Sequence, residues 1–264
     1  MAARMAAKMG AEMGARIDCN VPNDQLGDDE WNVINHRMLP GQFSKSGFVA
    51  QTGWFFRRPE DARQIIKDDL EYLKSHTITT QNLANVLRTV VTTYKQVCRQ
   101  FGIHPDLNRH PIPVNTRFLV MYTSYMGAQQ CPFQNKDLDP EYHGHDYGDS
   151  DVEVICTKGG VKKTLKFGTL LMHLIEKHQF FESPRVEYRL SPADIIEFFG
   201  LQSQEPEKIL GDPLDETDMD ILRLFVKCLK LIDFEIDQRI YLGAFNLSEV
   251  AGDAGDATVE SGGK

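Results

Sequence analysis

Apolar residues recur at helical spacing in two neighbouring segments of the first half of the chain. Proline favours a first helical turn, so a helix is predicted to start at Pro59. Its apolar face carries Ala62, Ile65, Ile66, Leu70 and Leu73. A second helix follows, with Thr79 or Thr80 as its N-cap and Gly102 at its end. Its stripe is Leu83, Val86, Leu87, Val90, Val91, Tyr94, Val97, Cys98 and Phe101. The short link predicts an antiparallel helical hairpin that builds the core.

The next third of the chain has the pattern of strands. Residues 117–126 are rich in β-branched and aromatic types and predict a buried strand that ends at Gly127. Alternating apolar residues on either side of Gly159-Gly160 predict a β-hairpin. We further expect a helix over about 169–180, a short strand at 186–190, and a helix capped by Ser191 and ended by Gly200. The predicted fold class is α+β, with the helical hairpin and further helices packed on a small, mainly antiparallel sheet.

The remaining segments carry weaker patterns. Residues 1–20 predict a loose N-terminal helix, Cys19 to Glu30 a linker, and residues 31–58 a packed but irregular segment with one or two short strands. A last long helix is predicted from Thr217 to about Ile236, and residues 248–264 form an acidic tail expected to be disordered. We therefore expect one globular domain over 21–247, with 31–115 and 116–247 as alternative sub-units.

Composition narrows the class of protein. The 264 residues carry a net charge of −9, with basic residues scattered along the chain, which disfavours nucleic acid as a partner. Five cysteines without a paired spacing favour free thiols in a reducing compartment. No apolar run approaches the roughly 20 residues that span a bilayer. We expect a soluble, cytoplasmic protein, or a mitochondrial one if the basic N-terminal segment is a presequence.

Four of the eight histidines fall between Cys131 and His178. His143 and His145 are separated by one residue and flanked by acids, so they could supply two metal ligands from an extended loop. The alternative is a solvated polar loop.

The other two histidines lie on the predicted helix 169–180. Leu170, His173 and His178, preceded by a hairpin, resemble the helix of a two-cysteine, two-histidine zinc finger over roughly 25 residues. That family also needs two closely spaced cysteines, whereas this hairpin has only Cys156, and Thr164 stands where a core phenylalanine is usual. The alternative has His173 partly buried and hydrogen-bonded, with His178 favoured by the helix dipole.

The two clusters could form one zinc site, which would also hold the long loop in place. Its candidate ligands are Cys131, His143, His145, His173 and His178. Catalysis by Cys131 as a nucleophile with a nearby histidine is a weaker alternative.

Two functions remain open from the sequence. Phosphate-loop, dinucleotide-binding and nucleophile-elbow motifs are missing. This favours a non-enzymatic intracellular interaction or structural protein, with a protein partner or a homo-oligomer and a structural zinc ion. The alternative is a metal-dependent enzyme that uses the Cys131 to His178 region, and an open coordination position on a bound metal would distinguish it.

Overall fold

The computed structural model describes most of the first 201 residues of the chain. The described residues are 22–40, 54–55, 60–105, 110–133, 147–156, 162–186 and 189–201, together with Asp220 and Arg223. All but the last two belong to a unit that runs from Met1 to Pro213, which is described here by itself. The predicted N-terminal helix, last long helix and acidic tail lie outside the described residues or almost entirely so, as do His143 and His145.

The fold is α+β, as the sequence predicts. The sheet is antiparallel with the order β1-β2-β3-β4: β1 (Ile112–Pro113), β2 (Phe118–Gln130), β3 (Tyr147–Cys156) and β4 (Lys163–Gly168). The helices are η1 (Asn23–Gln25), α2 (Asp28–Arg37), α3 (Ala62–Ser75), α4 (Thr80–Gln100), α5 (Leu170–His178) and α6 (Pro192–Phe199). In the part of the chain that the structure describes, no helix is long and apolar enough to cross a membrane.

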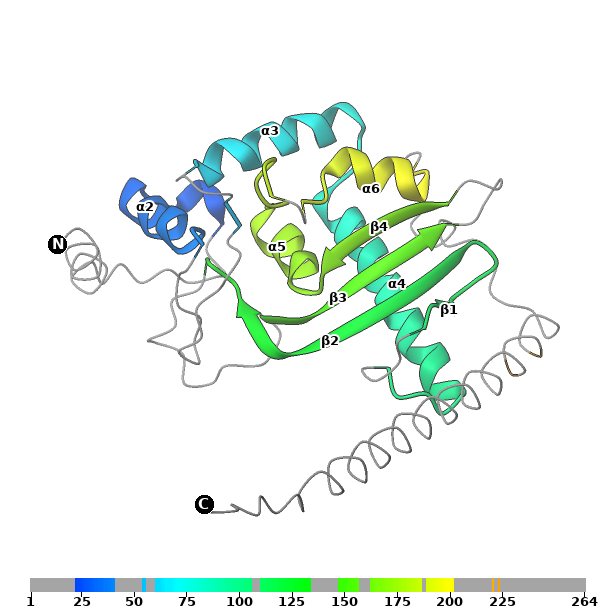
Figure 1. Ribbon diagram of the computed structural model, residues 1–264. Coiled ribbons are helices and arrows are strands. Elements are labelled where there is room, and N and C mark those ends of the chain that lie inside the picture. Colours follow the sequence, from blue (N-terminus) through cyan, green and yellow to red (C-terminus); the bar gives the residue numbers. More distant parts are fainter. Residues whose placement is uncertain are drawn as a thin grey trace, which may run out of the picture. The chain divides into compact units, whose positions relative to one another are not determined.

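One face of the sheet is buried because apolar side chains alternate along its strands. Phe118, Val120 and Tyr122 of β2 lie opposite Cys156, Val154 and Val152 of β3, and Leu165 and Phe167 of β4 continue the same face. Helix α4 crosses this face (Figure 1). Its Tyr94 stacks on Tyr122 with ring centroids 5.6 Å apart.

The helical hairpin has the predicted core and caps. Thr79 caps α4 by accepting a hydrogen bond from the Asn82 backbone N–H, and Gly102 follows the helix with a φ of 62°. Val90 is fully buried on the apolar stripe of α4. α3 begins three residues later than Pro59, because the Asp61 side chain accepts from the Arg63 N–H and fixes the N-cap there.

Three further sequence predictions are wrong. Residues 28–37 form α2 rather than the end of a linker and an irregular segment, because Trp31, Ile34 and Met38 share one helical face that is buried. β2 continues past Gly127 to Gln130 through an irregularity in its pairing with β3. The described part of the predicted strand 186–190 is not a strand but a connector held by side-chain contacts.

That connector, between α5 and α6, is fixed to α3. The buried Ser183 hydroxyl donates to the Glu60 carboxylate at 2.9 Å, and Arg189 forms an ion pair with the buried Asp69 of α3 at 2.6 Å. Arg189 also donates to the backbone carbonyl of Glu182, a residue with a φ of 68°. Burial raises the pKa of the Glu182 carboxyl to about 8, although Arg189 opposes the shift.

Gly148 brings the start of β3 against α5. A Cβ at Gly148 would lie 2.5 Å from the backbone nitrogen of Leu170 and 2.7 Å from its Cβ, so only glycine fits without displacement. The Thr169 N–H donates to the Ser150 carbonyl at 2.8 Å beside this contact. The sheet therefore sets the position of α5, which carries two of the predicted metal ligands.

Candidate metal centre

Cys131, His173 and His178 meet in the structure. Cys131 directly follows β2, and the two histidines lie on α5. One ligand atom from each lies within 4.8 Å of the other two. These three residues are among the candidate ligands proposed from the sequence, and the Cys131 Sγ lies 3.3 Å from the His178 Nε2.

The local sequence explains why His178 points inward. The buried face of α5 contains Leu170, Leu171, Leu174, Ile175 and His178, so the histidine occupies the next position of an apolar stripe. His173 lies beside this stripe and is half-buried. Side chains on a helix lean towards its N-terminus, so the His178 ring reaches back to His173. Their Nε2 atoms are 3.3 Å apart.

The separations are those of ligands around a single ion. With Zn–N bonds of about 2.0–2.1 Å and a Zn–S bond of about 2.3 Å, tetrahedral geometry places two nitrogens ~3.3 Å apart and a nitrogen and a sulfur ~3.6 Å apart. The nitrogen pair matches this expectation, and the sulfur to nitrogen distance of 3.3 Å is about 0.3 Å shorter.

The same nitrogen of His178 faces both partners. A neutral imidazole nitrogen carries either one proton or one lone pair, so it makes one strong hydrogen bond in the imidazole plane. Hydrogen bonding alone therefore accounts poorly for Cys131 and His173 both lying 3.3 Å from His178 Nε2. A cation placed between the three atoms would satisfy all of them. Thiolate and imidazole are ligands that zinc prefers.

Burial also affects the protonation state of the His178 ligand. Cys131 and His178 are each 1% exposed. Burial, together with the smaller effects of the neighbouring His173 and Lys177, lowers the pKa of His178 to about 3. The His178 ring is therefore neutral at pH 7, which is the state that binds a metal.

Neighbouring side chains orient the ligands. The Phe133 ring lies parallel to the His178 ring, with centroids 4.1 Å apart and an interplanar angle of 2°. Trp31 of α2 contacts Phe133 edge-on at 6.2 Å. The Asn23 amide donates to the His178 carbonyl at 2.6 Å, and Arg37 donates to the Pro132 carbonyl at 3.5 Å. The segment 22–40 thus contacts both parts of the candidate centre.

These supporting residues were missed at the level of sequence. Residues 22–30 read as a polar linker, and nothing local links Asn23 to a helix end 155 residues away. The signal that could have found α2 is the acidic first turn, Asp28 to Glu30, followed by apolar residues at helical spacing.

The remaining residues proposed as metal ligands from the sequence, and the resemblance to a zinc finger, are not placed at this centre by the structure. His143 and His145 lie outside the described residues, so their participation stays a prediction. β3, β4 and α5 do follow one another in the ββα order of a zinc finger. Cys156, however, pairs with Lys163 in the hairpin, and the cysteine that meets the histidines is Cys131.

Comparisons of the chain with protein families, with curated proteins and with solved structures found no match.

Proposed function

We propose that this chain is a non-enzymatic interaction or structural protein in which a zinc ion joins the end of β2 to α5. The observation that carries the proposal is the convergence of the Cys131 sulfur and the two Nε2 atoms of His173 and His178. These residues come from segments 47 positions apart, so a shared ion would fix the end of the sheet to the helix. Cys98, Cys131 and Cys156 are buried and form no disulfide bond, which suits a reducing compartment.

The fourth ligand decides between a structural and a catalytic ion. A closed site would take His143 or His145, which the sequence predicts as ligands, whereas an open site would hold a water molecule. His173 is half-buried, so solvent reaches one side of the group, and this favours a metal-dependent enzyme as the second candidate. Phe133 stacks on the His178 ring and Asn23 donates to the His178 carbonyl, and these contacts to a ligand suit the structural role better.

The first experiment is metal analysis of the purified protein. We expect about one zinc ion per chain after loading, since the three ligands are arranged for one ion. Cys131→Ser and His178→Ala should lose the metal. Cys156→Ser is the matched control, because Cys156 is also buried and free but stands apart from the histidines, and it should retain the metal. A wild-type chain that binds no zinc, or equal loss in both cysteine variants, would contradict the proposal.

The second experiment separates the two kinds of site. Cobalt replaces zinc with the same geometry and gives visible bands that report the ligands. If the site is closed, His143→Ala or His145→Ala should change the cobalt spectrum, and added imidazole should not. If it is open, added imidazole should change the spectrum of the unaltered protein, and the enzyme candidate would be favoured. Chelation should raise hydrogen exchange at 131–133 and in α5 while α4 stays protected.

A further inference from the structure

Three aromatic rings contact Phe133, and one of these contacts differs from the other two. Trp31 and Phe180 meet the Phe133 ring at interplanar angles of 85° and 66°, with centroids 6.2 and 5.9 Å away. His178 lies parallel to it, with an interplanar angle of 2° and centroids 4.1 Å apart. Neutral aromatic pairs usually lie edge to face or offset, with centroids about 4.5–7 Å apart. The contact with the candidate metal ligand is closer than this range and parallel.

A close parallel contact is favoured when one of the two rings is electron-poor. The face of a phenyl ring carries the negative part of its quadrupole and attracts cations within about 6 Å of its centroid. A metal ion withdraws electron density from an imidazole that binds it, so a metal-bound His178 ring would carry part of a positive charge. The face of Phe133 therefore attracts the metal-bound form of His178 more strongly than the metal-free form.

The ion itself would not come between the two rings. The Nε2 atom of His178 lies 3.3 Å from both the Cys131 Sγ and the His173 Nε2. The lone pair of this nitrogen lies in the plane of the imidazole, so a metal bound there lies in that plane too. The face of the imidazole can thus stay against Phe133 while its edge holds the ion.

Burial keeps water from screening this attraction. Phe133 and His178 are each 1% exposed. The attraction between a cation and an aromatic face is strongest when both groups are desolvated, and it then changes a dissociation constant roughly ten-fold or more. The contact is therefore large enough to affect how well the centre retains a metal.

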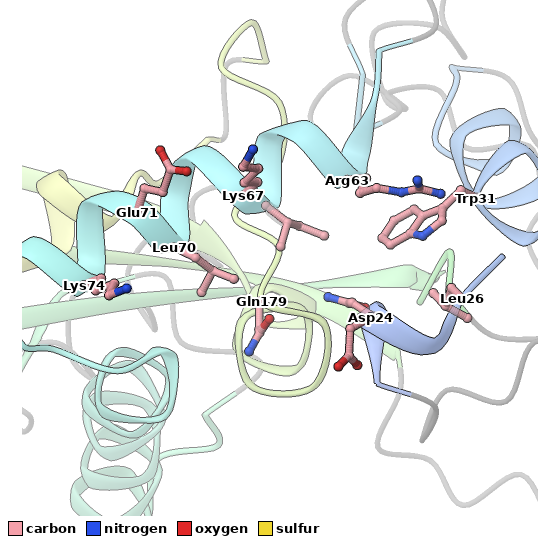
Figure 2. Close-up of a pocket in the computed structure, with 11 residues that line it drawn as sticks. Asp24, Leu26, Trp31, Arg63, Lys67, Leu70, Glu71, Lys74 and Gln179 are labelled. Carbon is pink, nitrogen blue, oxygen red and sulfur yellow. The ribbon is translucent and has the colours of Figure 1, made fainter. Parts of the chain in front are cut away.

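The surroundings hold the Phe133 ring in place. Trp31 and Phe180 contact it edge-on. Trp31 is in turn covered by Arg63 of α3, whose Cζ lies 5.4 Å from the indole centroid (Figure 2). Phe133 also follows Cys131 by two residues, so one short segment supplies both a ligand and the ring that supports another ligand.

We propose that Phe133 is a positioning residue of the metal centre, whose aromatic face holds the His178 imidazole and stabilises its metal-bound form. Retention of the ion then depends on the electron density of the Phe133 ring and not only on its size. This inference rests on the zinc ion of the proposed function. It adds a residue that does not touch the metal but sets how tightly the metal is held.

Fluorinated phenylalanines test electron density separately from size. Each fluorine withdraws electrons from the face of the ring and adds little volume. Mono-, di- and trifluorinated phenylalanine at position 133 of the full chain should weaken zinc binding stepwise, by roughly ten-fold or more for the trifluorinated ring. Competition with a chromophoric chelator measures the zinc dissociation constant. The cobalt bands should keep their positions across the series, because the ligands are unchanged.

The same series at Phe167 is the matched control. Phe167 is fully buried as well but lies on β4, and fluorination there should leave the zinc dissociation constant unchanged. The stability of the metal-free chain in urea should not follow the number of fluorines at Phe133, because a neutral imidazole is not attracted to an electron-rich face.

The outcomes separate this inference from the zinc site itself. If the zinc affinity is equal across the Phe133 series, rises with fluorination, or falls as much in the Phe167 series, Phe133 only fills space and the inference is wrong, while the zinc site stands. If the unaltered chain binds no zinc, the proposed zinc site fails and this inference fails with it.

Discussion

The close approach of β3 to α5 allows a sharp test of the fold around the candidate metal centre. Gly148→Ala would place a Cβ 2.5 Å from the Leu170 nitrogen, and ordinary van der Waals contact begins at 3.4 Å. Strand and helix must therefore separate by about 0.9 Å in a packed region, and overpacking of this kind costs about 1–3 kcal/mol. The backbone nitrogen cannot rotate away as a flexible side chain would.

Gly168→Ala is the matched control. A Cβ there would meet only Asp151 Oδ1 at 3.8 Å, which is ordinary contact. Both alanines reduce the entropy of the unfolded chain equally, by about 0.4–1 kcal/mol, so the difference between the variants isolates the clash. Urea denaturation should show Gly148→Ala to be less stable than Gly168→Ala by about 2 kcal/mol, and its melting temperature should be lower by ~4–8 °C. Equal stabilities of the two variants would refute the close packing of β3 on α5.

Three other substitutions test the core and the connector. Val90→Asp should abolish soluble, cooperatively folding protein, because an unpaired buried charge costs several kcal/mol, while Thr89→Asp on the exposed side of α4 should fold normally. Asp69→Asn should lower the free energy of unfolding by about 3–5 kcal/mol, since it leaves the largely buried Arg189 without its anion; a loss below 1 kcal/mol would show that the pair is unimportant. The folded state holds the Glu182 proton up to about pH 8 whereas the unfolded chain releases it near 4.5, so stability should fall as the pH rises through this window. Glu182→Gln should flatten that part of the pH profile, and an unchanged slope would contradict the assignment.

Periodicity predicted the parts of the fold that bury a continuous apolar face. α4 is the clearest case, because its stripe, its Thr79 cap and its Gly102 terminator all agree. α6 was predicted equally well from Ser191 and Gly200. Turn signals were less reliable inside the sheet. β2 passes through Gly127, because its pairing with β3 resumes at Gln129 after the irregularity.

The candidate site was only half predictable. Cys131, His173 and His178 could be proposed as metal ligands from the sequence, because cysteine and histidine are among the few residue types that bind transition metals. Their proximity depends on the hairpin of β3 and β4, which returns the chain to the end of β2. The roles of Phe133 and Asn23 could not be predicted. Neither a ring that stacks on His178 nor an amide that donates to its carbonyl produces a repeating pattern in the sequence.

The hydrogen bond from Asn23 to His178 has a consequence for synthesis on the ribosome. Its two residues are 155 positions apart, so at about 5–20 residues per second the acceptor is made roughly 8–31 s after the donor. For much of that interval neither Phe133 nor α5 has been made, so Trp31, Ile34 and Met38 lack these members of their buried cluster. The nascent chain therefore presents an apolar helix early, and a chaperone that binds such helices would have a natural target in residues 22–40.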